Sequence, residues 1–212
     1  AALISRALGA GQEARARRLG SLVLLAGTGT IALLALLLWG VQEPVFRRLG
    51  ADAATLALIR AYWAPQLLAA WLGAALYFGY SLFRAHGDTW LPGKMMVVTS
   101  LVNLGLDPLL IFGVGDWDGL GLPGAAWATA IAFSCGLLVL GRRLRGTDWL
   151  SWQGLGREAR ASARPFAGIA GPAMVSQLMP PLAAMLAISV VATLGEASVA
   201  ARLSDSERPA ST

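Results

Sequence analysis

The sequence predicts an all-α protein, a polytopic transmembrane helical bundle. Of its 212 residues, 56% are hydrophobic and 14% are charged, whereas soluble domains average about 45–50% and about 25%. The charged residues also gather between apolar stretches of about 20 residues. That is the length that crosses a hydrocarbon core about 30 Å thick at a rise of 1.5 Å per residue.

The first two predicted spans cover residues 21–41 and 56–83. A polar Gln-Glu-Pro sequence at 42–44 follows the first span, and we expect its proline to end the helix. Pro65 lies inside the second span and predicts a kink near its start. The mostly apolar residues 1–8 are interpreted as the end of a preceding helix.

The third and fourth predicted spans cover residues 92–115 and 121–140. Between them, Gly119, Gly121 and Gly124 spell G-x-G-x-x-G. A dinucleotide site needs a β-strand before this pattern, and here a membrane span precedes it. The glycines are therefore interpreted as a tight turn outside the membrane.

A polar, basic connection at 142–164 leads to the fifth predicted span, at 165–194. Prolines at 172, 180 and 181 interrupt this span. The hydrophilic end, 202–212, has too little apolar surface to offset the entropy of ordering. It is expected to be disordered or non-native sequence.

Positive charge predicts the orientation, because cytoplasmic connections carry the excess of Lys and Arg. The connections before the first span, between the second and third, and between the fourth and fifth are rich in basic residues, whereas the opposite connections have few. The first span is therefore expected to start in the cytoplasm. The net charge of +5 is interpreted as anchoring charge that flanks the spans, and no nucleic-acid partner is expected. Cys135 is the only cysteine, which excludes a disulfide framework.

Asp107 is the residue that points most directly to function, because a charged side chain within a span costs about 2.5–3.5 kcal/mol on translocon scales. Asn103 lies four residues earlier, on the same helix face. Pro108 frees the carbonyl of Leu104 at membrane depth. These oxygens suit Na⁺, and a buried carboxylate suits a proton equally well. The alternative is a structural clamp between helices.

Three further residues are candidates of different kinds. Thr129, in the middle of the fourth span, is positioned to join Asp107 and Asn103 or to bond its own helix. Gln177 lies between prolines in the fifth span, as in a broken helix that lines a substrate cavity, or in a helix kinked for packing. His86 is interpreted as a solvated loop residue.

Five stretches of the chain resemble the MATE (multidrug and toxic compound extrusion) family, most closely its DinF-like bacterial branch. They cover five successive parts of the family's first six-helix lobe, from the end of its second helix to its sixth: ALISRALGAGQ (2–12), IRAYWAP (59–65), LFRAHGDTWLP (82–92), LVNLGLDPLLIFG (101–113) and GLPGAAWATAIA (121–132). The stretches in the fifth and sixth helices are the most specific.

The resemblance implies a partial MATE-type fold. Residues 1–141 would be the N-terminal lobe from the end of helix 2 to helix 6, 142–164 the cytoplasmic linker between lobes, and 165–201 the first helix of the second lobe, with 202–212 the hydrophilic tail. Asn103, Asp107 and Thr129 match the family's coupling-cation site. The site's fourth residue, an aspartate of the first helix, has no counterpart here, and Leu56 stands where a tyrosine is common.

The function implied by the resemblance is cation-coupled efflux, driven by H⁺ or Na⁺, across the bacterial inner membrane, with no other cofactor. The substrates would be small amphipathic or cationic drug-like compounds, and the chain would be a truncated antiporter rather than an enzyme. The alternatives are a lipid-linked precursor flippase of related fold and a non-transporting membrane scaffold. A membrane enzyme that uses Asp107 with His86 is disfavoured, because the two residues are predicted at different depths.

Overall fold

The computed structural model describes residues 2–48, 50 and 52–206, and in its last helix the side chains of 155–168, 171–172, 175–180, 182–184 and 186. The chain forms two compact units, Ala1–Arg160 and Ala161–Thr212. Among the described residues, all regular secondary structure is α-helical. In order, the helices are α1 (Ala2–Gly9), α2 (Glu13–Arg48), α3 (Ala53–Ala85), α4 (Trp90–Phe112), α5 (Leu122–Arg145) and α6 (Leu155–Ser206).

Four of these helices, α2 to α5, are long and apolar enough to cross a membrane. They correspond to the first four predicted spans, so the predicted all-α membrane bundle is confirmed for this part of the chain. The fifth predicted span falls on α6, whose side chains are described only in part, and it stays a prediction.

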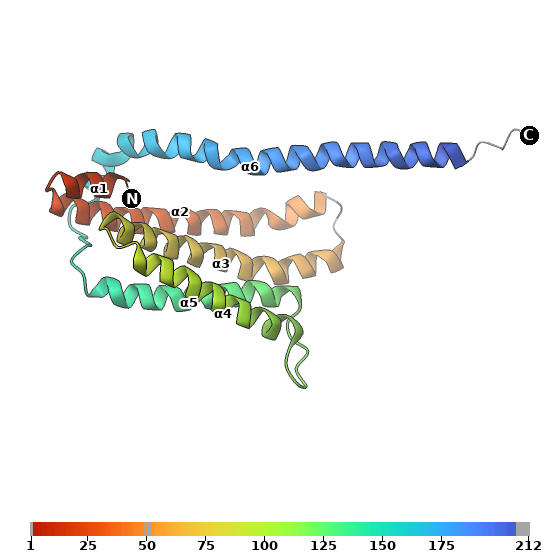
Figure 1. The fold of residues 1–212 in the computed structure, drawn as a ribbon, viewed down its shortest axis with the longest axis horizontal. Coiled ribbons are helices and arrows are strands. Elements are labelled where there is room, and N and C mark those ends of the chain that lie inside the picture. The colour runs from red at the N-terminus through yellow and green to blue at the C-terminus, as the bar shows by residue number, and fades with distance from the viewer. Residues whose placement is uncertain (1, 49, 51, 207–212) are drawn as a thin grey trace, which may run out of the picture. The chain divides into compact units, whose positions relative to one another are not determined.

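Within the first unit, α2 packs on α3, α3 on α5, and α5 on α4 (Figure 1). The short helix α1, the turn from α3 to α4 and the connection 146–154 lie at one end of this unit. The turns from α2 to α3 and from α4 to α5 lie at the other end. This grouping matches the two sides that the charge pattern predicts, and we call the first the basic end.

Small residues allow α3 and α5 to approach closely. A Cβ on Gly73 would lie 2.7 Å from the Phe133 ring, and one on Gly136 would lie 3.1 Å from the Leu76 side chain. Small residues also dominate the buried face of α5. Close backbone approach of this kind stabilises helix pairs in membranes, where burial of apolar surface gives little advantage over lipid.

The packed core lies toward the basic end. Leu76, Tyr80 and Phe83 of α3 form one buried cluster with Met95 and Leu140. A second cluster joins α1, α2 and α3, and Trp149 packs against both. In contrast, α2 exposes a long run of leucines between Leu25 and Leu38. A face of this composition fits lipid or further helices.

Three predicted helix boundaries are wrong. Pro44 does not end α2, which continues to Arg48, because Phe46 packs edge-on against Trp63 at 5.8 Å and Arg47 pairs with Glu43 in the same last turn. The connection predicted at 142–164 is non-helical only from 146 to 154. Arginines suit the C-terminal end of α5, and Glu158 suits the first turn of α6.

Helix α6 also differs from the prediction. It is helical through the prolines at 172, 180 and 181 and continues to Ser206. The first residues of the predicted disordered tail are therefore helical, since extending an existing helix adds one hydrogen bond per residue and needs no buried surface. Residues 207–212 lie outside the described residues.

Candidate functional site

Three side chains from two helices meet at the site that the sequence predicts. The Asn103 amide on α4 donates to Thr129 Oγ1 on α5 at 3.2 Å and to Asp107 Oδ1 at 3.4 Å. Thr129 Oγ1 in turn donates to the Ala125 carbonyl at 3.0 Å. All three side chains are half-buried. The structure therefore brings Asn103, Asp107 and Thr129 together, and both predicted bonding modes of Thr129 are present at once.

Local sequence explains how α4 contributes its part. A spacing of four residues places Asn103 and Asp107 one turn apart on the same face. Pro108 lies inside α4 and has no N–H for the carbonyl of Leu104. The group of atoms consists of a carboxylate, an amide oxygen, a hydroxyl and a freed carbonyl. This is the donor set that hard cations such as Na⁺ prefer, and the carboxylate can equally accept a proton.

The turn between α4 and α5 fixes which residues face each other. Leu120 N–H donates to the Leu110 carbonyl at 2.8 Å, and Gly121 N–H donates to the Ile111 carbonyl at 3.1 Å. Gly113 has a φ of +82°, a conformation that favours glycine. Gly124 lies against Leu110, where a Cβ would be 2.2 Å from the carbonyl oxygen. The predicted glycine turn thus sets the register that places Thr129 beside Asn103.

Gln177 lies on α6, and its side chain is exposed. It belongs to the second unit, whereas the site on α4 and α5 belongs to the first. Its flanking prolines do not break the helix. The assignment of Gln177 to a substrate cavity stays a prediction.

The interpretation of His86 as a solvated loop residue is wrong. Its ring is half-buried and stacks on Trp149, with centroids 4.0 Å apart and planes at 12°. Its Nδ1 lies 2.9 Å from the Leu82 carbonyl, so Nδ1 carries the hydrogen that it donates. Asp107 lies 17 residues into α4, about 25 Å along the helix from its start near His86. These positions separate the two residues that a membrane enzyme would need to combine.

Sequence reasoning missed the contacts that hold the basic end together. Glu158, at the start of α6, pairs with Arg15 at 3.1 Å and with Arg18 at 3.4 Å, and its own side chain is 8% exposed. Ser21, fully buried, accepts the Ser151 N–H at 2.9 Å. The sequence analysis used Arg15 and Arg18 only to predict orientation. It did not predict their tertiary role, because their partner lies about 140 residues away in the sequence.

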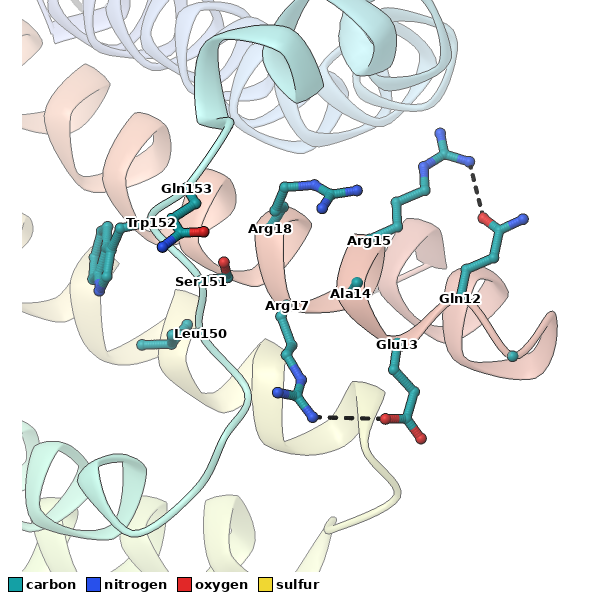
Figure 2. A pocket seen from close by; sticks show the side chains of 11 residues that line it. Gln12, Glu13, Ala14, Arg15, Arg17, Arg18, Leu150, Ser151, Trp152 and Gln153 are labelled. Carbon is teal, nitrogen blue, oxygen red and sulfur yellow. Dashed lines mark hydrogen bonds and ion pairs between the residues drawn. The ribbon is translucent and has the colours of Figure 1, made fainter.

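The same end contains a cavity of about 1160 Å³ that sequence reasoning also missed (Figure 2). It lies between the start of α2 and the connection 146–154. Its lining includes Arg15, Arg17 and Arg18 together with Leu150 and Trp152. A basic segment followed 130 residues later by an exposed tryptophan is too weak a pattern to reveal it.

Comparison with known proteins gives consistent matches. The MatE family profile matches residues 1–109. A protein of Shewanella oneidensis named "FAD transporter" is 34% identical over 165 residues, which cover 75% of this chain and 36% of that protein. The Bacillus subtilis "Probable multidrug resistance protein YoeA" is 39% identical over 66 residues, which cover 31% of this chain and 14% of that protein. The chain thus spans about a third or less of these relatives.

A solved structure agrees with the observed helix arrangement. The Vibrio cholerae MATE transporter VcmN, in its bent form, superposes with a TM-score of 0.79 at 44% identity. The match covers 96% of this chain and 46% of VcmN. With the family profile over half of the sequence, these findings show that the chain belongs to the MatE family of membrane transporters.

Proposed function

We propose that this chain is part of a cation-coupled multidrug efflux antiporter of the bacterial inner membrane, in the DinF-like branch. Residues 1–141 would be most of its first lobe, 142–164 the linker, 165–201 the start of its second lobe and 202–212 a hydrophilic tail. The observation that carries the proposal is the bridge from Asn103 to Asp107 and Thr129 within two apolar helices. The name of the Bacillus subtilis relative supports drug-like, amphipathic or cationic substrates.

In this proposal, Asp107 exchanges the coupling ion. Na⁺ held by the carboxylate and the Asn103 carbonyl oxygen, or a proton on the carboxylate, changes what the Asn103 amide can bond. The bridge between α4 and α5 then weakens or strengthens with occupancy. An ion shifts the lobe between outward-facing and inward-facing states only by the difference in its affinity for the two. A group that gives the two states different ion affinities should bind the ion and also contact a second helix. Asn103 and Asp107 are suited to this, because they offer oxygen ligands on α4 and the Asn103 amide also bonds to Thr129 on α5.

The test is Asp107→Asn in the full-length transporter, assayed by substrate accumulation in inverted vesicles. We expect coupled efflux to be lost while expression and membrane insertion are unchanged. Asp116→Asn, in the exposed turn after α4, is the matched control and should transport normally. Undiminished efflux by Asp107→Asn would refute the coupling role. Accumulation of a lipid-linked precursor instead of drugs would favour a flippase, and no accumulation by the parent protein would favour a scaffold.

Flavin nucleotide export is a second candidate, favoured by the name of the Shewanella oneidensis relative. Measuring FAD and a cationic dye in the same vesicles separates the two substrate classes. Uptake of FAD without uptake of the dye would replace the multidrug assignment. The role of Asp107 in coupling would then be tested by the same Asp107→Asn substitution, with FAD as the substrate.

A further inference from the structure

The cavity at the basic end has the composition of an anion site. Arg15, Arg17 and Arg18 line the cavity from the start of α2, and Leu150 and Trp152 line it from the connection, with their side chains on the side away from the arginines (Figure 2). Trp152 is 61% exposed. The guanidinium groups can contact a phosphate, and the exposed Trp152 ring on the neighbouring connection can contact hydrocarbon.

Buried charge holds two of these arginines in place. Both Arg15 and Arg18 direct their Nε atoms at the carboxylate of Glu158, which is nearly covered by protein. This contact uses the Nε of each guanidinium, and one terminal nitrogen of Arg15 donates to Gln12 Oε1 at 3.3 Å. The other terminal nitrogens are donors of the kind that bind phosphate. Two guanidinium groups on one carboxylate also leave a net positive charge. Arg17 pairs only loosely with Glu13, at 3.6 Å, and both side chains are exposed.

Depth in the membrane identifies the source of the phosphate. The apolar run of α2 starts at residue 21, so Arg17 lies about 6 Å outside the hydrocarbon core. The polar headgroup layer on each side of a bilayer is about 5–8 Å thick. Arg17 and its neighbours therefore lie at the level of lipid phosphates, at the end of the unit that the charge pattern places in the cytoplasm.

We propose that this cavity binds the headgroup of an anionic phospholipid from the cytoplasmic leaflet. Basic pockets beside membrane helices on this side are suited to such lipids. The phosphate contacts the arginines, and the exposed ring of Trp152 contacts the glycerol and upper acyl chains. A soluble phosphate compound can make the contact with the arginines, but it has no acyl chain to contact the apolar part of the cavity.

The experiment measures quenching of tryptophan fluorescence in the purified protein by brominated phosphatidylglycerol and brominated phosphatidylcholine in detergent micelles. The part of the quenching that is lost in Trp152→Phe reports lipid at the cavity. We expect phosphatidylglycerol to quench this part at a lower lipid fraction than phosphatidylcholine. Equal quenching by the two lipids would overturn the proposal.

Charge variants locate the headgroup contact. Arg17→Gln, which leaves the Glu158 pairs intact, should raise the phosphatidylglycerol requirement about five-fold, the usual contribution of one basic side chain near the surface. Arg17→Lys should retain most of the affinity. Arg48→Gln, which removes the same charge from the opposite end of α2, should change nothing. Equal effects of Arg17→Gln and Arg48→Gln would show non-specific attraction and overturn the proposal.

Competition separates the two sources of phosphate. Excess inorganic phosphate, compared with sodium chloride at the same ionic strength, should not displace the lipid, because it lacks the apolar part. Displacement by phosphate alone would assign the cavity to a soluble anion and overturn the lipid assignment. Native mass spectrometry, in which phosphatidylglycerol should stay on the parent protein and be lost from Arg17→Gln, gives a second readout that does not depend on fluorescence.

Discussion

Gly124→Ala should separate α4 from α5 and damage the candidate site without touching it. The new Cβ would lie 2.2 Å from the Leu110 carbonyl oxygen and 2.5 Å from its carbon. These are backbone atoms that no side-chain rotation can move away, so the helices must part by about 1 Å. Thr129 lies five residues along α5, close enough to follow this displacement.

The magnitude follows from two losses and one partly offsetting gain. Forcing a methyl group into a packed contact costs about 1–3 kcal/mol. A shift of about 1 Å lengthens the 3.2 Å bond from Asn103 to Thr129 beyond hydrogen-bonding range, which costs up to about 1.7 kcal/mol in a membrane. The better helix propensity of alanine returns about 0.5–1 kcal/mol. With the average value of about 0.6 kcal/mol for such a bond at the low end, the net loss is about 0.6–4 kcal/mol.

The assay is the thermal unfolding midpoint of the purified protein in detergent, with efflux measured in parallel. Gly141→Ala is the control, because Gly141 is in the same helix and no atom lies within 4 Å of its added Cβ. We expect the midpoint of Gly124→Ala to fall by several degrees and its efflux to decrease, while Gly141→Ala keeps both. If Gly124→Ala is as stable and active as the parent, the glycine contact does not set the register of the site.

Two further predictions concern ionised groups at opposite ends of the first unit. Glu158→Gln should lower stability by about 1–2 kcal/mol, because Arg15 and Arg18 lose a charged acceptor that protein covers, and the thermal midpoint measures this. At the other end, hydrogen bonds from the Thr55 hydroxyl and then its backbone N–H hold the pKa of Asp52 below its ordinary value. The cap on α3 is therefore complete above about pH 4 and is lost as the pH falls through that lowered pKa, which amide exchange at Thr55 should detect.

Matched variants make both predictions decisive. Glu13→Gln removes an exposed partner of Arg17 and should change stability by less than about 0.5 kcal/mol. An equal loss from Glu13→Gln would mean that burial of the Glu158 carboxylate adds nothing. Asp52→Asn should abolish the acid-dependent change at Thr55, and its persistence would place the titrating group elsewhere.

Local sequence pattern was sufficient to find four membrane helices, though not all of their ends, and two of the three site residues. Spans α2 to α5 follow from length and hydropathy alone, and the one-turn spacing of Asn103 and Asp107 needs only helical geometry. That Thr129 completes the group was implied by family resemblance and left open by spacing, because the register between α4 and α5 depends on Gly124 meeting a particular carbonyl.

The misjudged positions are those where tertiary contacts override local preference. Pro44 is a helix-stopping signal by sequence, yet a ring contact and an ion pair hold the next turn in place. His86 looked solvated because the ring it stacks on, Trp149, comes 63 residues later. Residues this far apart in the sequence are not related by helical or strand periodicity. Their contacts are therefore found only in the folded structure.

The glycine contacts between helices make the sequence unequally tolerant of change. Glycine is the smallest residue, so every substitution at Gly73, Gly124 or Gly136 adds volume to a contact that has none to spare. At the exposed leucines of α2, one apolar side chain can replace another with little effect on packing within the unit. In a saturation mutagenesis survey, the glycine positions should tolerate almost no substitution. The leucine positions of α2 should tolerate most substitutions by other apolar residues.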